Sequence, residues 1–261
     1  MDPLVAGRDA ILERATRHFA AEPDIAGAFL SGSLADGSAD RYSDLDLRVV
    51  VFNDAPIDAR AHAPMSWGDF LFHEHVGPDV TVSQFAPGCR VDVVYYAVET
   101  FAPNPWLALP VEILFEKDCT VSRVVEASRG LSFGPADHAL GSHLAKAVSC
   151  ISEATKCLRR GEPVYASHLA KRVVETLLRV EDRGHDRPPI GLSRVDTRAS
   201  EGLLDLAASL AGAVDPPSVA RSVGVASGAV RSAIVAVHDM GDIDERLRDA
   251  LLAGLTLSEA L

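Results

Sequence analysis

The pattern of apolar and polar positions predicts one helix and five strands in the first hundred residues. Residues 7–20 place Ile11, Ala15 and Phe19 at helical spacing, and Pro23 ends this periodic segment. Short runs rich in valine, leucine and phenylalanine then predict strands over residues 25–30, 45–52, 69–76, 80–85 and 90–98. Residues 53–68, rich in proline, aspartate and alanine, are expected to form a loop, and the proline-rich residues 102–110 a connector.

From about residue 135 the apolar spacing is helical throughout. One face of the first helical segment collects seven apolar positions, namely Leu140, Leu144, Ala147, Val148, Ile151, Ala154 and Leu158. Gly161 is the residue expected to stop this helix. A second helix is predicted over residues 164–182, and segments rich in alanine and valine predict further helices near residues 199–213, 217–239 and 243–257.

The order of these elements indicates the fold class. Strands come first and helices last, with no repeat of fixed period, which is typical of an α+β fold followed by a helical domain. The length of 261 residues is sufficient for two modest domains. We therefore predict a sheet-containing domain over residues 1–130 and an α-helical domain over residues 131–261.

The charge of the chain bears on its partners. The sequence holds 25 lysine and arginine residues against 37 aspartate and glutamate residues, a formal net charge of −12 with neutral histidines. Such a surface repels the phosphate backbone of nucleic acids, so no nucleic-acid partner is expected. The acidity suits a cationic small substrate, and it is equally common as a means of keeping a protein in solution.

No targeting or membrane signal changes this picture. The first residues carry early charges and no apolar segment of the signal-peptide type, and no run approaches the length of a membrane span. The four cysteines show no CxxC spacing, which predicts reduced thiols; they are Cys89, Cys119, Cys150 and Cys157. We expect a cytoplasmic protein without a membrane partner.

The candidate chemistry lies in residues 29–52, FLSGSLADGSADRYSDLDLRVVVF. Asp44 and Asp46 bracket Leu45 at the start of a predicted strand, where side chains two residues apart share one face. A third acid, Asp92, interrupts the valines of another predicted strand. Unpaired carboxylates in such apolar surroundings are costly, which suggests that a cation lies between them.

Three aspartates on neighbouring strands would suit Mg²⁺, which prefers carboxylates together with substrate phosphates. Two such ions can bridge an attacking oxygen and a phosphoryl group. Gly32 would then allow close approach of the backbone. Ser33 and the amides of a following helical turn would bind phosphate oxygens.

These residues resemble the DNA polymerase β-type nucleotidyltransferase superfamily. The shared features are Gly32-Ser33, a gap of about ten residues, Asp44-Leu45-Asp46, and a third carboxylate that matches Asp92. The resemblance covers roughly residues 8–98. It is strongest to aminoglycoside and lincosamide adenylyltransferases, which join a minimal nucleotidyltransferase domain to a C-terminal helical bundle. It implies a mixed sheet, two Mg²⁺ ions, and an NTP, with ATP first, whose nucleoside monophosphate passes to a hydroxyl while pyrophosphate leaves.

The acceptor is the open part of this functional expectation. The resemblance favours a hydroxylated small molecule, with an aminoglycoside-type antibiotic as the leading candidate. Two alternatives stay open: a nucleotidyltransferase of toxin–antitoxin type that modifies a partner protein, and a non-catalytic nucleotide-binding module. Oligomeric state is not specified by any motif.

Several acidic and histidine residues have simpler interpretations. Asp92 is either a metal ligand and general base or a structural acid paired with Arg48 or Arg90. Asp36 and Asp40, in the polar loop, are expected to be solvated or to cap turns. His73 and His75 would share a strand face, but a histidine pair without a third ligand is more often ordinary strand decoration than a zinc site.

The predicted helix over residues 164–182 carries a polar stripe opposite its apolar face, formed by His168, Lys171, Glu175, Arg179 and Asp182. The simplest interpretation is a solvated face with spaced charge pairs. In the alternative, Lys171 neutralises triphosphate charge and Glu175 takes the proton of the acceptor hydroxyl. Whether Asp92 or a glutamate of the helical domain is the general base stays open at this stage.

Overall fold

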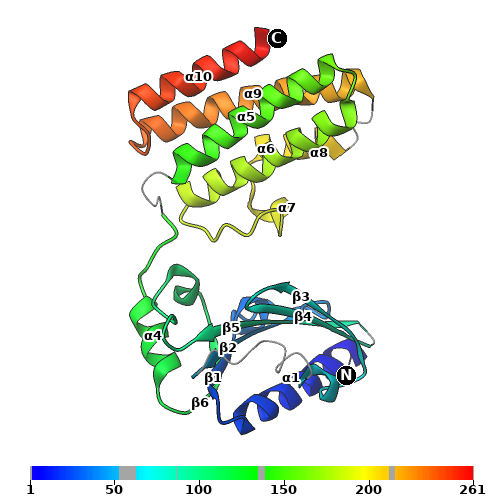
Figure 1. The fold of residues 1–261 in the computed structure, drawn as a ribbon, viewed down its shortest axis with the longest axis vertical. Coiled ribbons are helices and arrows are strands. Elements are labelled where there is room, and N and C mark those ends of the chain that lie inside the picture. The colour runs from blue at the N-terminus through cyan, green and yellow to red at the C-terminus, as the bar shows by residue number, and fades with distance from the viewer. Residues whose placement is uncertain (1, 53–62, 87, 135–138, 212–214, 261) are drawn as a thin grey trace. The chain divides into compact units, whose positions relative to one another are not determined.

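The computed structural model describes residues 2–52, 63–86, 88–134, 139–211 and 215–260. The chain divides into two compact units, Met1–Ser132 and Phe133–Leu261 (Figure 1). The predicted loop over residues 53–68 falls largely outside the described residues. Its last part forms the 3₁₀ helix η1, Ala63–Ser66, and is followed by the fully buried Trp67.

The first unit is built on a six-stranded mixed sheet with the order β3-β4-β5-β2-β1-β6. Its strands are β1 Ile25–Leu30, β2 Leu45–Val51, β3 Phe70–Gly77, β4 Val80–Phe85, β5 Cys89–Ala97 and β6 Glu112–Glu116. Strands β2 and β5 are parallel, and every other neighbouring pair is antiparallel. The mixed sheet confirms the predicted α+β class.

Helices cover the two faces of this sheet (Figure 1). Helix α1, Pro3–Ala21, begins at a proline after the capping carboxylate of Asp2, which accepts a hydrogen bond from the amide of Leu4 (2.9 Å). Its apolar side packs on one face of the sheet, where Phe19 meets Trp67 edge to face at 5.3 Å. On the opposite face, α4, Thr120–Ser128, and the 3₁₀ helix η2, Pro105–Ala108, cover the part around β1 and the end of β2.

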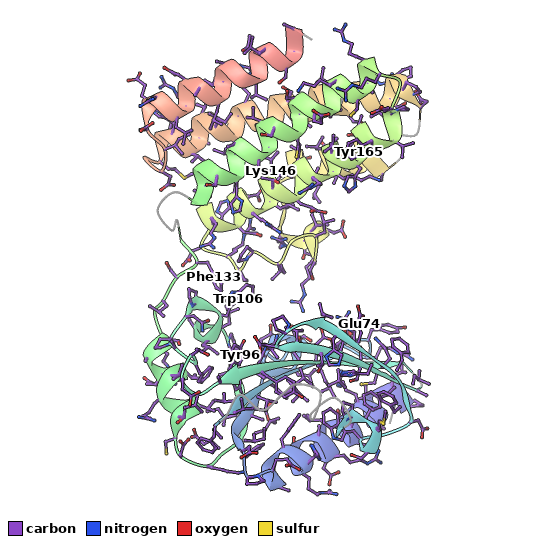
Figure 2. All side chains as sticks on the ribbon, in the orientation of Figure 1. Glu74, Tyr96, Trp106, Phe133, Lys146 and Tyr165 are labelled. Atoms are coloured by element: carbon purple, nitrogen blue, oxygen red, sulfur yellow. The ribbon has the colours of Figure 1, made fainter. Side chains whose placement is uncertain are left out.

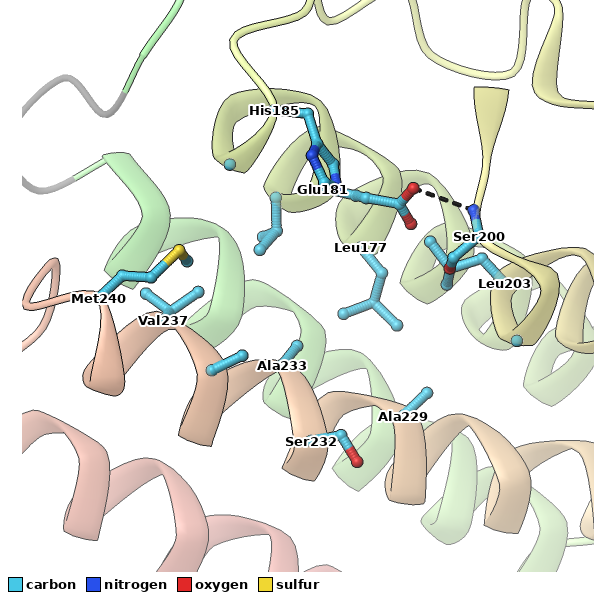
Figure 3. A pocket seen from close by; sticks show the side chains of 14 residues that line it. Leu177, Glu181, His185, Ser200, Leu203, Ala229, Ser232, Ala233, Val237 and Met240 are labelled. Atoms are coloured by element: carbon cyan, nitrogen blue, oxygen red, sulfur yellow. Dashed lines mark hydrogen bonds between the residues drawn. The ribbon is translucent and has the colours of Figure 1, made fainter. Parts of the chain in front are cut away.

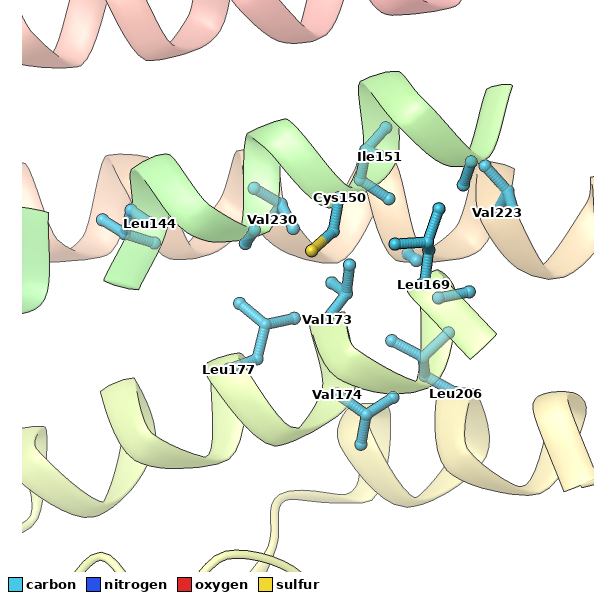
Figure 4. Packing of buried hydrophobic residues seen from close by; sticks show 14 of the residues in the cluster. Leu144, Cys150, Ile151, Leu169, Val173, Val174, Leu177, Leu206, Val223 and Val230 are labelled. Carbon is cyan, nitrogen blue, oxygen red and sulfur yellow. The ribbon is translucent and has the colours of Figure 1, made fainter. Parts of the chain in front are cut away.

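The second unit is helical. Its elements are α5 Ala139–Arg159, α6 Pro163–Gly184, α7 Val195–Arg198, α8 Glu201–Ala211, α9 Pro216–Asp239 and α10 Glu245–Ala260. Buried side chains of α5, α6, α8 and α9 interlock in one core, as Leu144, Val173, Leu206 and Val230 show in Figure 4. The helices therefore follow the predicted apolar faces.

The end of α5 has the glycine stop that the sequence predicts. Gly161 has φ +76°, and its amide donates to the carbonyl of Leu158 (3.1 Å) while the amide of Glu162 donates to the carbonyl of Cys157 (2.9 Å). This pair of hydrogen bonds is a Schellman motif, which needs a left-handed residue at this position. Cys157 and Cys150 are buried free thiols, in agreement with the prediction.

The prediction that Asp182 lies on a solvated stripe is wrong. Asp182 is fully buried near the end of α6, and its carboxylate pairs with Arg198 and, at 3.5 Å, with Arg187. The amide of Arg187 also donates to the carbonyl of Asp182 (2.7 Å). The segment after α6 thus folds back over the last turn of the helix and buries Asp182. The spacing of residues within the helix cannot predict this contact.

The sequence predicts no membrane span. Within the described part of the chain, however, α9 is long and apolar enough to cross a membrane. It has 24 residues, and its buried side chains, among them Val223, Val230 and Ile234, belong to the core of the second unit. Buried core helices satisfy the same two criteria. Length and composition alone therefore do not make α9 a membrane helix.

Candidate active site

The three predicted aspartates gather where β2 and β5 begin. Asp46 is the second residue of β2 and Asp92 lies in the first half of β5, and the two are register partners across the parallel pair. Their neighbours Leu45, Leu47 and Val91 point to the opposite, fully buried face of the sheet. Alternation therefore places both carboxylates on the other face, where each remains partly accessible.

Asp44 completes this set, called here the aspartate triplet (Asp44, Asp46 and Asp92). It immediately precedes β2 and is half-buried. Its charge interacts with those of Asp92 and Asp46, so the three carboxylates act on one another electrostatically. The structure therefore brings together the three acids that the sequence singled out.

Gly32 lies directly against the triplet. Strand β1 runs antiparallel to β2, so the end of β1 lies beside the start of β2, and the amide of Ser31 donates to the carbonyl of Asp46 (3.0 Å). Gly32 has φ +67°, and a Cβ placed there would collide with an Oδ atom of Asp46. Only glycine accommodates both the left-handed backbone and the adjacent carboxylate.

Ser33 follows in α2, a single helical turn over Gly32–Ala35. Its side chain is half-buried. The predicted arrangement of a glycine, a serine and a helical turn is thus present beside Asp46. Binding of phosphate oxygens by Ser33 remains a prediction.

A buried arginine, which the sequence analysis missed, holds the loop that leads to Asp44. Arg8 of α1 is 8% exposed and donates through Nη1 to the carbonyls of Asp40 (2.8 Å) and Ser43 (3.4 Å). It shares a helix face with Ile11 and Ala15. The sequence did contain a signal for this role, since Arg8 is a single arginine on an otherwise apolar helix face. A buried cation in such a position needs hydrogen-bond acceptors from elsewhere in the fold.

Asp36 and Asp40 have the local roles that the sequence predicts. Asp36 accepts a hydrogen bond from the amide of Ser38 (2.8 Å), and Asp40 accepts from the amide of Tyr42 (2.8 Å). The hydrogen bond from Tyr42, followed by one from Ser43, holds the pKa of Asp40 below its ordinary value. Both residues shape the loop and are exposed.

Burial sets the electrostatics of the triplet. It is the largest cause that raises the pKa of Asp44 and the pKa of Asp46 above the ordinary aspartate range. Arg90 opposes the shift at Asp44 and Arg48 opposes it at Asp46, while Asp92 raises the pKa of both. The ionised forms of Asp44 and Asp46 are therefore less favourable in the folded protein than in the unfolded chain, and both would gain from an added cation.

Two arginines already offset part of this charge. Arg90 forms a two-pronged pair with Asp92, with Nε–Oδ1 and Nη2–Oδ2 distances of 2.7 and 2.8 Å, and this hydrogen bonding raises the pKa of Arg90. The side chain of Arg48 lies 3.5 Å from Asp46. Of the two partners considered for Asp92 from the sequence, the structure shows Arg90.

The donor set of the triplet fits Mg²⁺, but its present geometry is not a closed metal site. Carboxylate oxygens are the ligands that Mg²⁺ prefers, and the acids converge from adjacent strands. Among the described residues, no group of three or more histidine, cysteine, aspartate or glutamate side chains is arranged to hold a metal ion. Each Asp92 oxygen accepts one hydrogen bond from Arg90, and a carboxylate oxygen has a second lone pair that can bind a cation.

Lys171 and Glu175 belong to the second unit, so their part in this site stays a prediction. Lys171 is exposed on α6 and Glu175 is half-buried. His168 is also exposed and stacks on Tyr165, labelled in Figure 2, with ring centroids 6.2 Å apart. These exposures agree with a solvated stripe for all its members except Asp182.

The histidine pair of β3 lies away from the triplet, on the edge strand that also carries Glu74 (Figure 2). The rings of His73 and His75 are 4.7 Å apart, and His73 Nδ1 lies 3.1 Å from the hydroxyl oxygen of Ser83. The described part of the chain supplies no third ligand to them. The pair therefore keeps its simpler interpretation as strand decoration.

Replacing Gly32 by alanine is expected to lower the stability of the protein. The left-handed backbone costs a non-glycine residue about 1–2 kcal/mol, and the new Cβ also displaces the Asp46 carboxylate. Gly37→Ala is the matched control, because Gly37 has φ +76° and open space around the site of its Cβ. Thermal unfolding should show a larger loss for Gly32→Ala; equal losses would contradict the close packing of Gly32 on Asp46.

Comparisons with known proteins do not assign the chain to a family. No protein-family model matches the chain, and no curated protein matches it significantly. Matching solved structures include a nucleotidyltransferase-like protein from Exiguobacterium sibiricum 255-15. That match has 12% sequence identity and a TM-score of 0.42, and it covers 87% of this chain and 76% of the other. At this level the function has to be argued from the geometry of the site.

Proposed function

We propose that the protein is a Mg²⁺-dependent nucleotidyltransferase that moves a nucleoside monophosphate, with AMP as the first candidate, from an NTP to a hydroxyl of a small molecule. One observation carries the proposal: Asp46 and Asp92 are register partners on adjacent parallel strands, with Asp44 two residues before Asp46 and Gly32 packed on its carboxylate. An aminoglycoside-type antibiotic is the acceptor to test first.

The residues of the first unit have distinct parts in this proposal. Asp44, Asp46 and Asp92 would hold Mg²⁺, which when bound neutralises phosphate charge and stabilises an in-line displacement. Gly32 leaves room for the Asp46 carboxylate and for close approach of the triphosphate. The hydroxyl of Ser33 donates to a phosphate oxygen, and Arg8 fixes the loop that carries Asp44.

Asp92 is the proposed general base. It takes the proton of the acceptor hydroxyl while the hydroxyl oxygen forms a bond to the α-phosphorus. The bond between this phosphorus and the bridging oxygen breaks, and pyrophosphate leaves with the electron pair. Arg90, which grips Asp92 with two hydrogen bonds, orients this carboxylate.

One observation favours a second candidate, a nucleotide-binding module without catalysis. Asp92 pairs with Arg90, and Arg48 lies 3.5 Å from Asp46, so arginines of the chain offset part of the charge of these acids without a metal. A module of this kind would bind an NTP but would not transfer its nucleoside monophosphate to an acceptor. The same experiment distinguishes the two candidates.

The direct test incubates the protein with labelled NTPs, Mg²⁺ and a panel of aminoglycosides and lincosamides, and searches for nucleotidyl adducts by mass spectrometry. An adduct on a panel compound, absent with Asp46→Asn, supports transfer. Stable NTP binding with no transfer to any hydroxyl compound and no release of pyrophosphate supports the non-catalytic candidate.

Mg²⁺ and NTP together are expected to raise the melting temperature far more than the sum of their separate effects. The carboxylates repel one another until a cation arrives, and the phosphates complete its ligand shell. A ligand at a hundred times its Kd adds about 2.7 kcal/mol of stability, which corresponds to several degrees. Asp46→Asn is the control and should lose the synergy; additive shifts in the wild type would contradict a shared site.

A further inference from the structure

The second unit contains a cavity that the proposed transfer reaction does not use. It has a volume of about 500 Å³ and lies among α6, the start of α8, and α9 (Figure 3). Leu177, Leu203 and Val237 form its buried apolar wall, and α9 contributes small side chains such as Ala229 and Ala233. This volume is within the range of about 300–1,000 Å³ that is usual for small-molecule sites.

The carboxylate of Glu181 is a polar group of the cavity that hydrogen bonds hold in place, and His185, Ser200 and Ser232 also line the cavity. Glu181 Oε1 accepts hydrogen bonds from the amide of Ser200 (2.9 Å), drawn in Figure 3, and from Nη2 of Arg187 (3.0 Å). The side chain is only 16% exposed. Two hydrogen bonds on one oxygen hold the carboxylate in place, and no hydrogen bond within the described residues is made to Oε2.

We propose that this cavity binds a small apolar molecule whose single polar head is a hydrogen-bond donor, an amine before an alcohol. The apolar wall favours a hydrocarbon or aromatic body, because transfer of apolar groups from water into an apolar cavity is favourable. The acceptor oxygen of Glu181 favours a donor head and repels a carboxylate. The inference is independent of nucleotidyl transfer, since it concerns only residues of the second unit.

The probe for this site is N-phenyl-1-naphthylamine, an uncharged molecule in which a phenyl and a naphthyl group are joined by one N–H donor. The fluorescence of this probe rises in apolar surroundings. Both tryptophans of the chain, Trp67 and Trp106, lie in the first unit, and neither lines the cavity of the second unit. The full-length protein is expected to bind it saturably with one site per chain. A linear, unsaturable rise in fluorescence would overturn the proposal.

Competition by three ten-carbon compounds tests the head group. Decylamine should displace the probe at the lowest concentration, decanol next and decanoate last, each below its micelle-forming concentration. A hydrogen bond to a charged group contributes enough to separate the amine from the carboxylate by about tenfold or more. Equal potency of decylamine and decanoate would overturn the assigned role of Glu181.

Two variants place the probe in this cavity. Ala233→Phe fills it from α9 and should weaken probe binding by about tenfold or more, while Ala220→Phe makes the same change at an exposed position of the same helix and should leave binding unchanged. Circular dichroism checks that both are folded. If Ala233→Phe does not fold, Ser232→Phe, at an exposed lining position, takes its place. Equal probe binding by the filled variant and the control would overturn the location.

Glu181→Gln separates charge from shape. The amide keeps the size of the side chain and an oxygen that can accept from Ser200, but it replaces the other carboxylate oxygen by an NH₂ donor and removes the negative charge. The advantage of decylamine over decanoate should fall by about tenfold, with binding of the uncharged probe changed much less. An unchanged amine preference would show that Glu181 does not contact the head group.

Discussion

Asp46→Asn is expected to reduce nucleotidyl transfer by at least about a hundredfold while raising the melting temperature of the metal-free protein. The loss of rate follows from removing a ligand of the proposed Mg²⁺ site, because the cation stabilises negative charge on the reacting phosphate and loss of one such preorganised group typically costs about 10²- to 10³-fold. The gain in stability follows from the surroundings of Asp46. Burial raises its pKa, and Asp92 adds to the shift against the opposing effect of Arg48.

The sign of the stability effect follows from this raised pKa. A carboxyl whose pKa is higher in the folded than in the unfolded protein stabilises the fold while it is protonated, and this contribution is lost as the pH rises through the folded pKa. At neutral pH the ionised Asp46 therefore destabilises the metal-free fold, and asparagine removes that effect. The difference in melting temperature should be largest at neutral pH and shrink toward about pH 3, where the carboxyl is protonated in both states.

Asp40→Asn is the matched control for Asp46→Asn. Asp40 is exposed, its pKa is lowered chiefly by the hydrogen bond from the amide of Tyr42, and asparagine can accept the same bond. The control should leave transfer unchanged, and its stability effect should have the opposite sign. Asp44→Asn should behave like Asp46→Asn, because burial also raises the pKa of Asp44. Near-wild-type turnover in both site variants would end the metal assignment.

The fold could be predicted where apolar spacing decides the element. Strands β1, β2 and β4 and the long helices of the second unit present regular buried faces, and the structure confirms them. Strand β6 was missed: it has five residues, follows a proline-rich connector, and owes its place to pairing with β1. Helix α4 was missed as well, since it has only nine residues and covers the sheet through long-range packing.

The acids of the site could be predicted, whereas their partners could not. Asp46 and Asp92 each interrupt an apolar alternation, and such an interruption is visible along the chain. The register that makes them neighbours depends on the parallel pairing of β2 with β5, which no local pattern specifies. Arg8 reaches acceptors 32 and 35 residues away, so its role appears only in three dimensions.

Asp92→Asn is expected to separate the two roles proposed for Asp92, metal ligand and general base. If Asp92 is only a metal ligand, metal-dependent NTP binding and the rate should fall in equal proportion. If it is also the general base, the rate should fall by a further factor of about 10²–10⁴, which is the usual contribution of general-base assistance. The acidic limb of the pH–rate profile, on which the wild-type rate rises as the base loses its proton, should then flatten in the variant.

Lys171→Ala provides the contrast to Asp92→Asn. Lys171 is exposed on α6, and loss of its charge should raise the NTP concentration required while leaving the acidic limb in place. In Asp92→Asn, the asparagine keeps one oxygen that can accept a hydrogen bond from Arg90, so only one of the two Arg90 hydrogen bonds is lost. This makes the comparison sharper. Single-turnover rates and NTP affinities, each measured against pH, separate binding from chemistry. If Asp92→Asn loses NTP binding and rate in equal proportion and the acidic limb of its pH–rate profile is unchanged, the general base is another residue. Glu175→Gln would then be the next variant, since Glu175 is half-buried one helical turn beyond Lys171.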